Sequence, residues 1–393
     1  MEDKCSNDQP THEAASSRLS SAGALDGLHP SLVDPVEYRK SGLSLNHVIG
    51  CPIDCAYCVR HVFDNFSMKQ PQALMSDEDA VAYLLSHPYF VAHRTPVQLF
   101  NRATDPFLPQ VKPHTFRVLG LLGDRELTNH VLVITRFRVS EEDAKRLNSF
   151  SPLRVTLLVT HSGIDDARLE PVDSEIAERS LITAHGLARS YKVILYWRPM
   201  VGGLNDSPAH VRKAARLSHH AHATAFTGLF HRDQMRAFYR QNGLAEPYGE
   251  AARRKVLPGE LESKVIDGFA SAGGRYLFRK TSCAVAFAHG EPDYNGHYGV
   301  REICDICPSS QLGRCASDWA TPSAEEVTRV AKDVGAPQFE TIDKRAITFA
   351  ELDEQRRYYI QHALRYQVHD ARHPHHAGRH GRADLGWEER TSG

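Results

Sequence analysis

The 393-residue chain has no apolar run that approaches the roughly 18 residues of a membrane-spanning helix. Its first residues are polar and acidic, without the apolar segment of a signal peptide. An excess of one charge is also missing, because 47 lysines and arginines face 48 aspartates and glutamates. A strong basic excess is the main electrostatic mark of a nucleic-acid-binding protein. We therefore expect a cytoplasmic protein with no membrane partner, and nucleic acid is an alternative partner rather than the favoured one.

Cysteine is absent between residues 58 and 283, which divides the eight cysteines into two groups and one outlier. Disulfide scaffolds are short, secreted and cysteine-dense, and this chain is none of these. Two compact groups in a long chain instead indicate two metal sites. We name them the three-cysteine group (Cys51, Cys55 and Cys58) and the four-cysteine group (Cys283, Cys304, Cys307 and Cys315). The remaining Cys5 is interpreted as an uninvolved thiol.

Short runs rich in Val, Ile, Leu, Thr and Phe alternate with helical patterns along the middle of the chain. Such runs are typical of buried parallel strands, and they lie at 43–49, 96–100, 131–137, 155–160, 193–199 and 223–230. The helical patterns lie at 77–86, 114–123, 141–150, 174–190 and 207–220. Six units are too few for a closed eight-stranded barrel, so the pattern predicts an α/β fold, an open partial (β/α)6 barrel. The loops at the carboxyl ends of its strands would form one mouth.

The flanking segments complete the predicted organisation. Residues 1–40 are expected to form a disordered leader, 41–232 the partial barrel, and 233–322 a C-terminal cysteine-rich extension. Two further helices, at 323–334 and 351–368, predict a helical cap over 323–368. Residues 369–393 are rich in His, Arg and Gly and are expected to form a disordered tail.

The three-cysteine group has the spacing C-x3-C-x2-C directly after the first predicted strand. Three thiolates this close can hold a 4Fe–4S cluster and leave its fourth iron without a protein ligand. An open iron suits a cluster that binds and activates a small molecule. Zinc is the alternative, and it would recruit His47 or His61 as a fourth ligand.

Cys51, Cys55, Tyr57 and Cys58 together match C-x3-C-x-aromatic-C, and here the chain resembles the radical S-adenosylmethionine (SAM) superfamily. The resemblance implies that the open iron binds the amino and carboxylate groups of SAM. One electron from the reduced cluster then cleaves SAM to methionine and a 5′-deoxyadenosyl radical, which abstracts a hydrogen atom from the substrate. An electron donor such as flavodoxin or ferredoxin is implied as a partner. The fold would be the partial barrel of the radical SAM type.

Four further segments, at 101–107, 134–136, 169–171 and 199–206, resemble the spore-photoproduct-lyase-like branch. This resemblance implies a set of SAM contacts: Tyr57 beside the adenine, Asn101 near the methionine amine, Arg136 near the carboxylate, and Thr160 and Ser162 near the ribose or amine. An arginine can hold a carboxylate through two parallel hydrogen bonds. The alternative for Arg136 is a structural salt bridge, and for Thr104 and Asp105 a turn before Pro106.

The four-cysteine group has the spacing C-x20-C-x2-C-x7-C. Four thiolates can close a second 4Fe–4S cluster or a structural zinc site, or remain as unligated buried thiols. We favour the auxiliary cluster, because cluster-bearing extensions recur in the superfamily that the core resembles. The polar, glycine-rich stretch 289–301 between these cysteines is interpreted as a substrate lid, with a plain surface loop as the alternative.

Two enzymatic hypotheses and one non-enzymatic hypothesis follow. Lesion-repair members of the resembled branch use an additional cysteine downstream of the cluster motif, and this chain has none from 59 to 282. We therefore favour a biosynthetic or modifying enzyme that acts on a small-molecule or peptide substrate. Nucleic-acid lesion repair is the alternative, and a cluster-based sensor that does not cleave SAM is the third hypothesis.

Overall fold

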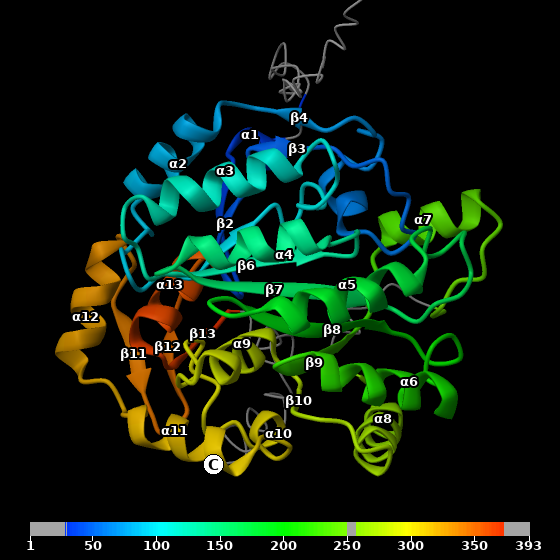
Figure 1. The fold of residues 1–393 in the computed structure, drawn as a ribbon. Coiled ribbons are helices and arrows are strands. Elements are labelled where there is room, and N and C mark those ends of the chain that lie inside the picture. The colour runs from blue at the N-terminus through cyan, green and yellow to red at the C-terminus, as the bar shows by residue number, and fades with distance from the viewer. Residues whose placement is uncertain (1–27, 29, 250–256, 373–393) are drawn as a thin grey trace, which may run out of the picture.

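The computed structural model describes residues 28, 30–249 and 257–372, and its centre is an eight-stranded sheet (Figure 1). The strand order is β1-β2-β5-β6-β7-β8-β9-β10. All neighbours are parallel except β1 and β2, which are antiparallel. The strands are β1 Val36–Arg39, β2 Gly42–Leu45, β5 Val97–Leu99, β6 His130–Thr135, β7 Arg154–His161, β8 Lys192–Met200, β9 Ala223–Gly228 and β10 Leu277–Phe278. The prediction of an α/β fold with a mostly parallel sheet is confirmed.

The central strands are parallel because both of their faces are covered. Seven of the eight residues of β7 are buried, and so are seven of the nine residues of β8. Near-continuous apolar strands of this kind require a layer on each side of the sheet. The first predicted strand is divided: β2 joins the main sheet, whereas β3 (Val48–Ile49) pairs with β4 (Gln72–Ala73).

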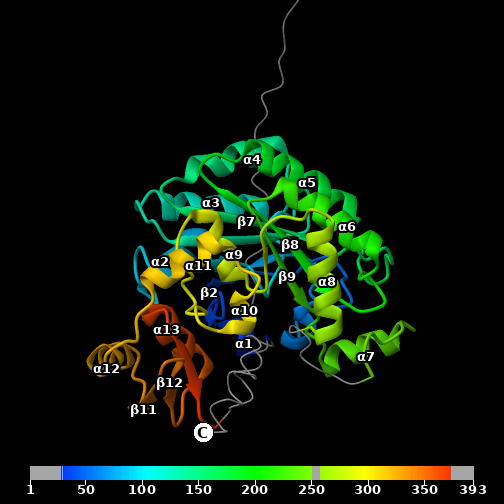
Figure 2. The same ribbon diagram turned by 90° about the horizontal axis from the view of Figure 1, so that it is seen from below.

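One layer consists of the predicted crossover helices, which lie in an arc outside the strands (Figure 2). They are α2 Asp77–Ser86, α3 Lys112–Gly123, α4 Glu141–Leu147, α5 Ser174–Leu187 and α6 Pro208–Leu217. Helix α8 (Gly259–Ser271) lies in the same layer. Their starts follow from local sequence. Ser76 accepts a hydrogen bond from the Asp79 amide, and Ser140 forms a complete capping box with Asp143.

The other side of the sheet is covered by the segments after residue 277. Helix α9 (Thr281–His289) packs on β8, β9 and β10. It is followed by α10 Arg301–Cys304, α11 Ser309–Asp318, α12 Ala324–Asp333 and α13 Glu354–Leu364, and by a small sheet of β11 Phe339–Ile342, β12 Ala346–Phe349 and β13 Gln367–Asp370. The remaining helices are α1 Pro30–Val33 and α7 Asp233–Gln241.

Two predicted boundaries are wrong. The helix expected over 351–368 ends at Leu364, because Arg365 takes a left-handed conformation (φ 49°) and the chain returns as β13, parallel to β12. Strand β13 also includes His369, which was assigned to the tail. The leader expected over 1–40 contains β1, whose alternating Val36 and Tyr38 are buried. Tyr38 then hydrogen-bonds His362 of α13 at 3.0 Å, which ties this edge strand to the C-terminal region.

Helix α1 also lies within the predicted leader. Residues 1–27 and 29 of that leader, with Cys5, and residues 373–393 of the predicted tail lie outside the described residues. Within the described ranges, no helix combines the length and the hydropathy needed to cross a membrane. The closure of the sheet into a partial barrel stays a prediction.

Candidate functional site

A cavity of about 270 Å³ lies at the carboxyl ends of the parallel strands. It brings together seven of the eight residues predicted for the cluster and SAM: Cys51, Cys55, Tyr57, Cys58, Asn101, Arg136 and Thr160. Ser162 does not line this cavity. Its hydroxyl accepts a hydrogen bond from the Ile164 amide, and its carbonyl accepts one from the Asn205 side chain at 2.6 Å. The predicted role of Ser162 in SAM binding therefore has no support from its position.

The loop that carries the three-cysteine group begins at a glycine that the packing requires. Gly50 has φ +97°, and a Cβ atom there would lie 2.4 Å from the carbonyl oxygen of Gln70. Its backbone can therefore turn sharply at the end of β3, directly before the first cysteine. The Cys51 amide then donates to the Met68 carbonyl at 2.8 Å, and the Ala56 amide donates to the Leu169 carbonyl at 3.0 Å.

Arg60 holds the same loop from the inside. Its guanidinium is 2% exposed and donates to four backbone carbonyls, those of Cys51, Asn65, Phe66 and Met68, at 2.7–2.9 Å. Buried carbonyls need donors, and a charged donor makes the stronger hydrogen bonds. Arg60 therefore fixes the path of the cysteine loop without contributing a ligand, a role that sequence analysis missed.

Arg136, Tyr57 and Glu170 form a buried polar cluster beside Cys55. The Arg136 guanidinium donates to the Glu170 carboxylate at 2.8 Å and to the Tyr57 hydroxyl at 2.6 Å. The Tyr57 hydroxyl also donates to Glu170, and the Cys55 sulfur lies 3.7 Å from the other carboxylate oxygen. Glu170 lies in the segment 169–171 that resembles the spore-photoproduct-lyase-like branch, but the sequence predicted no role for it. Its carboxylate is the partner that Arg136 has in this structure.

Asp105 connects the loop after β5 to the end of β6. Its carboxylate accepts hydrogen bonds from the Thr135 hydroxyl at 2.6 Å and from the amides of Arg136 and Phe107 at 2.9 Å. Burial raises the pKa of this carboxyl, and the three donors oppose that effect. The expected turn at Asp105 is present, and the same carboxylate also positions the backbone of Arg136.

The thiols of this site favour a metal cluster over a single ion. Burial raises the pKa values of Cys51 and Cys55 above the ordinary value, although Arg136 lowers that of Cys55, so both are neutral until metal replaces their protons. A tetrahedral zinc ion would hold its sulfur ligands about 3.8 Å apart. In the described residues, no three cysteine sulfurs lie within 4.8 Å of one another. The spacing fits a cluster, which is larger than one ion.

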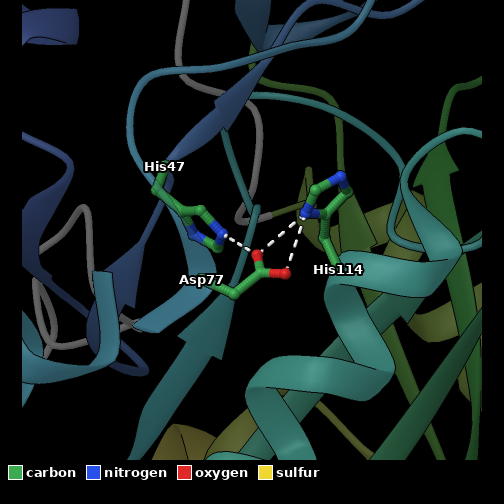
Figure 3. A group of neighbouring side chains, drawn as sticks. All are labelled: His47, Asp77 and His114. Atoms are coloured by element: carbon green, nitrogen blue, oxygen red, sulfur yellow. Dashed lines mark hydrogen bonds and ion pairs between the residues drawn. The ribbon is translucent and has the colours of Figure 1, made fainter. Parts of the chain in front are cut away.

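The alternative zinc ligands, His47 and His61, do not line the main cavity. His47 lies outside the cavity lining, where its Nε2 contacts Asp77 at 2.7 Å, and His114 Nδ1 contacts the same carboxylate at 2.8 Å (Figure 3). The His47 Nδ1 is buried without a partner among the described residues, so an ion on its Nε2 would lack there the second hydrogen bond that ligating histidines make. The trio therefore joins the β2–β3 connection to α2 and α3. His61 stacks on Phe66 at 3.6 Å.

The four-cysteine group meets around a second, small cavity of about 10 Å³, which Asp293, His297 and Gln311 also line. The Cys315 sulfur accepts hydrogen bonds from the Asp293 amide and the Gln311 side chain, both at 3.4 Å. Burial raises the pKa of Cys304 to about 11 and that of Cys307 to about 12. Three thiols from α9, α10 and α11 and the Cys307 thiol from the turn after α10 thus converge on one point, as a shared metal site requires.

The stretch interpreted as a lid is an interior wall. Asp293 and His297 are buried, and their side chains contact each other at 3.0 Å. His297 Nδ1 lies 3.9 Å from the Cys283 sulfur, and His297 lines both cavities. This stretch therefore separates the two cysteine groups. The sequence indicated this separating position of 289–301 only through the polar side chains that lie between the predicted metal ligands Cys283 and Cys304.

Comparisons with known proteins give limited similarity. No family model matches the chain, and no curated protein matches it. A structure of spore photoproduct lyase complexed with dinucleoside spore photoproduct aligns with 64% of this chain and 80% of that chain, at 13% identity and a TM-score of 0.46. Streptococcus suis SuiB bound to precursor peptide SuiA aligns with 60% of this chain and 47% of that chain, at 8% identity and a TM-score of 0.40. Both TM-scores are below 0.5, so neither likeness bears on the function.

Proposed function

We propose that this protein is a radical SAM enzyme. The observation that carries the proposal is the placement of the C-x3-C-x-aromatic-C motif: Cys51, Cys55, Tyr57 and Cys58 all open on one cavity at the carboxyl ends of a parallel sheet. In open parallel sheets this edge is where ligands bind. The sulfur spacing, which is too wide for a single zinc ion, supports the 4Fe–4S assignment.

Cys51, Cys55 and Cys58 would hold the cluster, and Tyr57, Asn101, Arg136 and Thr160 would contact SAM. When both are bound, they supply a 5′-deoxyadenosyl radical that abstracts hydrogen from a substrate. Arg136 already has one partner in Glu170, yet a guanidinium has five N–H donors, so it can also hold a carboxylate. Tyr57 and Thr160, both at most 8% exposed, would limit the access of water to the reaction.

We propose a second 4Fe–4S cluster at Cys283, Cys304, Cys307 and Cys315. All four line one cavity, and four thiolates are enough to close a cluster. Cys283 also lies with Asp293 and His297 in a buried trio that could hold a single ion, so zinc is the alternative that metal analysis must test. His297 separates this site from the main cavity, so the second cluster would lie one side chain away from the substrate. A flavodoxin or ferredoxin would supply the electron for SAM cleavage, and a cytoplasmic location would suit such a donor.

The substrate that we favour is a small molecule or a peptide. A cavity of about 270 Å³ that is partly enclosed by α9 and α13 fits a compact group rather than a duplex. The alternative, repair of a nucleic-acid lesion, would need another hydrogen donor in place of the cysteine that this chain lacks between residues 59 and 282.

The test is chromatographic detection of 5′-deoxyadenosine after anaerobic reconstitution with iron and sulfide and reduction in the presence of SAM. Cys55→Ala should abolish this product, because two thiolates cannot hold the cluster in its open form. Cys5→Ala is the matched control, since Cys5 belongs to neither group, and it should retain the product. Product from Cys55→Ala at the wild-type level would reject the proposal.

A further inference from the structure

The main cavity continues past the three-cysteine group to the start of α9, and its wall is strongly basic. Eight lysines and arginines line it against three carboxylates. The basic residues are Arg39, Lys40, Arg60, Arg102, Arg136, Arg198, Arg279 and Lys280, and the acidic residues are Glu37, Asp105 and Glu354. An excess of positive charge in an enclosed cavity favours an anionic ligand group.

Most of these arginines already have a carboxylate or a backbone carbonyl as a partner. Arg39 and Arg102 both pair with Glu37 at 3.0 Å, and Arg136 pairs with Glu170. Arg60 binds four backbone carbonyls, and Arg279 pairs with Glu262 and Asp305. Among the described arginines of the cavity wall, Arg198 alone has neither a carboxylate nor a carbonyl partner.

Arg198 is held in place by neutral groups. It follows Tyr196 by two residues on β8, so both side chains leave the same face of the strand and line the cavity, whereas Trp197 is buried. Its guanidinium donates to the Tyr196 hydroxyl at 3.0 Å and lies 4.7 Å from the centre of that ring. One of its five N–H groups is thus used, and the others remain for a ligand.

The Tyr196 hydroxyl connects Arg198 to α9, because it lies 3.1 Å from the Thr281 hydroxyl. Lys280 is the N-cap of this nine-residue helix and Thr281 and Ser282 are its first residues; all three line the cavity, and the Lys280 side chain makes no capping hydrogen bond. Uncapped amides and the helix dipole favour negative charge at this position.

A further polar atom at the same end has no partner. His297 lies 3.4 Å from Ser282, and its side chain is 1% exposed. Asp293 contacts the Nδ1 atom, and the Nε2 atom is buried without a partner in the described part of the chain. His297 lines both cavities and lies 3.9 Å from the Cys283 sulfur, so this unpartnered atom lies at the boundary between the main cavity and the four-cysteine group. Because Asp293 accepts the Nδ1 proton, Nε2 is an acceptor for an O–H or N–H group.

We infer that Arg198, Lys280 and the start of α9 form a subsite for an oxyanion group of the substrate, a carboxylate or a phosphate. A guanidinium binds such groups through two parallel hydrogen bonds. His297 would accept a hydrogen bond from a hydroxyl or amine of the same substrate. The inference rests on the proposed function, since it assigns this part of the cavity to the substrate and the Arg136 side to SAM.

The test is calorimetric titration of the reconstituted full chain with inorganic phosphate and with succinate, each with and without SAM. One of the two anions should bind with a dissociation constant on the order of 1 mM. Arg198→Gln should weaken that binding at least about tenfold, as the loss of a charge-assisted hydrogen-bond pair requires. Arg212→Gln, on the exposed side of α6, is the matched control and should change nothing.

The anion that binds identifies the class of substrate: phosphate indicates a phosphoester, and succinate a carboxylic acid. Wild-type protein that binds neither anion, or Arg198→Gln protein that binds equally well, would overturn the inference. A loss of SAM affinity in Arg198→Gln would also overturn it, because Arg198 would then belong to the cofactor. If the wild-type protein binds an anion but no SAM, the proposed function fails and the subsite stands.

Discussion

The two cysteine groups differ in how the chain brings their sulfurs together. The three-cysteine group lies within eight residues of one loop, which Arg60 holds from inside and which opens on the main cavity. The four-cysteine group spans 33 residues and three helices, and its sulfurs enclose a cavity of about 10 Å³. The first arrangement leaves room for a ligand beside the three thiols, and the second does not leave such room beside its four. This difference is the reason that we propose the reaction at the first site and support or electron transfer at the second.

The largest expected effect concerns the metal content of the two sites. Reconstituted wild-type protein should hold about eight irons, four at each group. The triple substitution of Cys283, Cys304 and Cys307 by Ala should remove about half of them and leave SAM binding in place. Iron and sulfide analysis, with zinc measured in parallel, checks this. Unchanged iron, or one zinc per chain in the native protein, would show that the second site is not a cluster.

Arg60→Met tests whether the loop of the three-cysteine group depends on the hydrogen bonds that the Arg60 guanidinium donates to its carbonyls. The variant removes four hydrogen bonds and leaves the carbonyls of Cys51 and Phe66 without a donor among the described residues, so the free energy of unfolding should fall by at least about 2 kcal/mol. Denaturant unfolding of the apoprotein measures it. Arg117→Met is the control, because Arg117 pairs with Glu78 on the surface, and it should cost less than about 1 kcal/mol. Equal losses in the two variants would mean that Arg60 does not hold the loop.

Arg136→Ala separates the predicted SAM contact from a structural salt bridge. If Arg136 binds the SAM carboxylate, SAM affinity should weaken by about 1.5–3 kcal/mol. Glu170→Gln removes the present partner but keeps Arg136, so it should retain SAM affinity. Equilibrium binding of SAM to reconstituted protein measures both. An unchanged dissociation constant for Arg136→Ala would return this residue to a purely structural role.

The smallest effect is on thiol reactivity in the apoprotein. Burial raises the pKa of Cys304 to about 11 and that of Cys307 to about 12, so both are protonated at neutral pH. Their alkylation by iodoacetamide should therefore continue to rise between pH 9 and about 10.5, where an ordinary thiol of pKa about 8.5 has levelled off. Mass spectrometry of Cys5 in the same samples gives the reference. A plateau below pH 9 at Cys304 would show that this group is open rather than enclosed.

Local sequence was sufficient for the predicted parallel strands and for the proposed site of the three-cysteine group, although it missed β1 and β10. Short apolar runs gave all six predicted parallel strands, because a buried strand needs no information beyond its own residues and the helix that follows it. The three cysteines are neighbours in sequence, so their spacing alone predicts a shared site. The helix starts at Ser76 and Ser140 were predicted for the same reason, since a cap is a contact across three residues.

The sequence by itself determined that this chain is an α/β protein with two groups of cysteines, for which we propose metal sites. Only the tertiary structure decided what surrounds them: Glu170 beside Arg136, His297 between the two cavities, β1 at the edge of the sheet, and Arg198 with no acidic partner among the described residues. Each of these depends on contacts between segments tens to hundreds of residues apart. Whether a charged side chain has a partner depends on all of these long-range contacts together, and a local sequence pattern does not contain them.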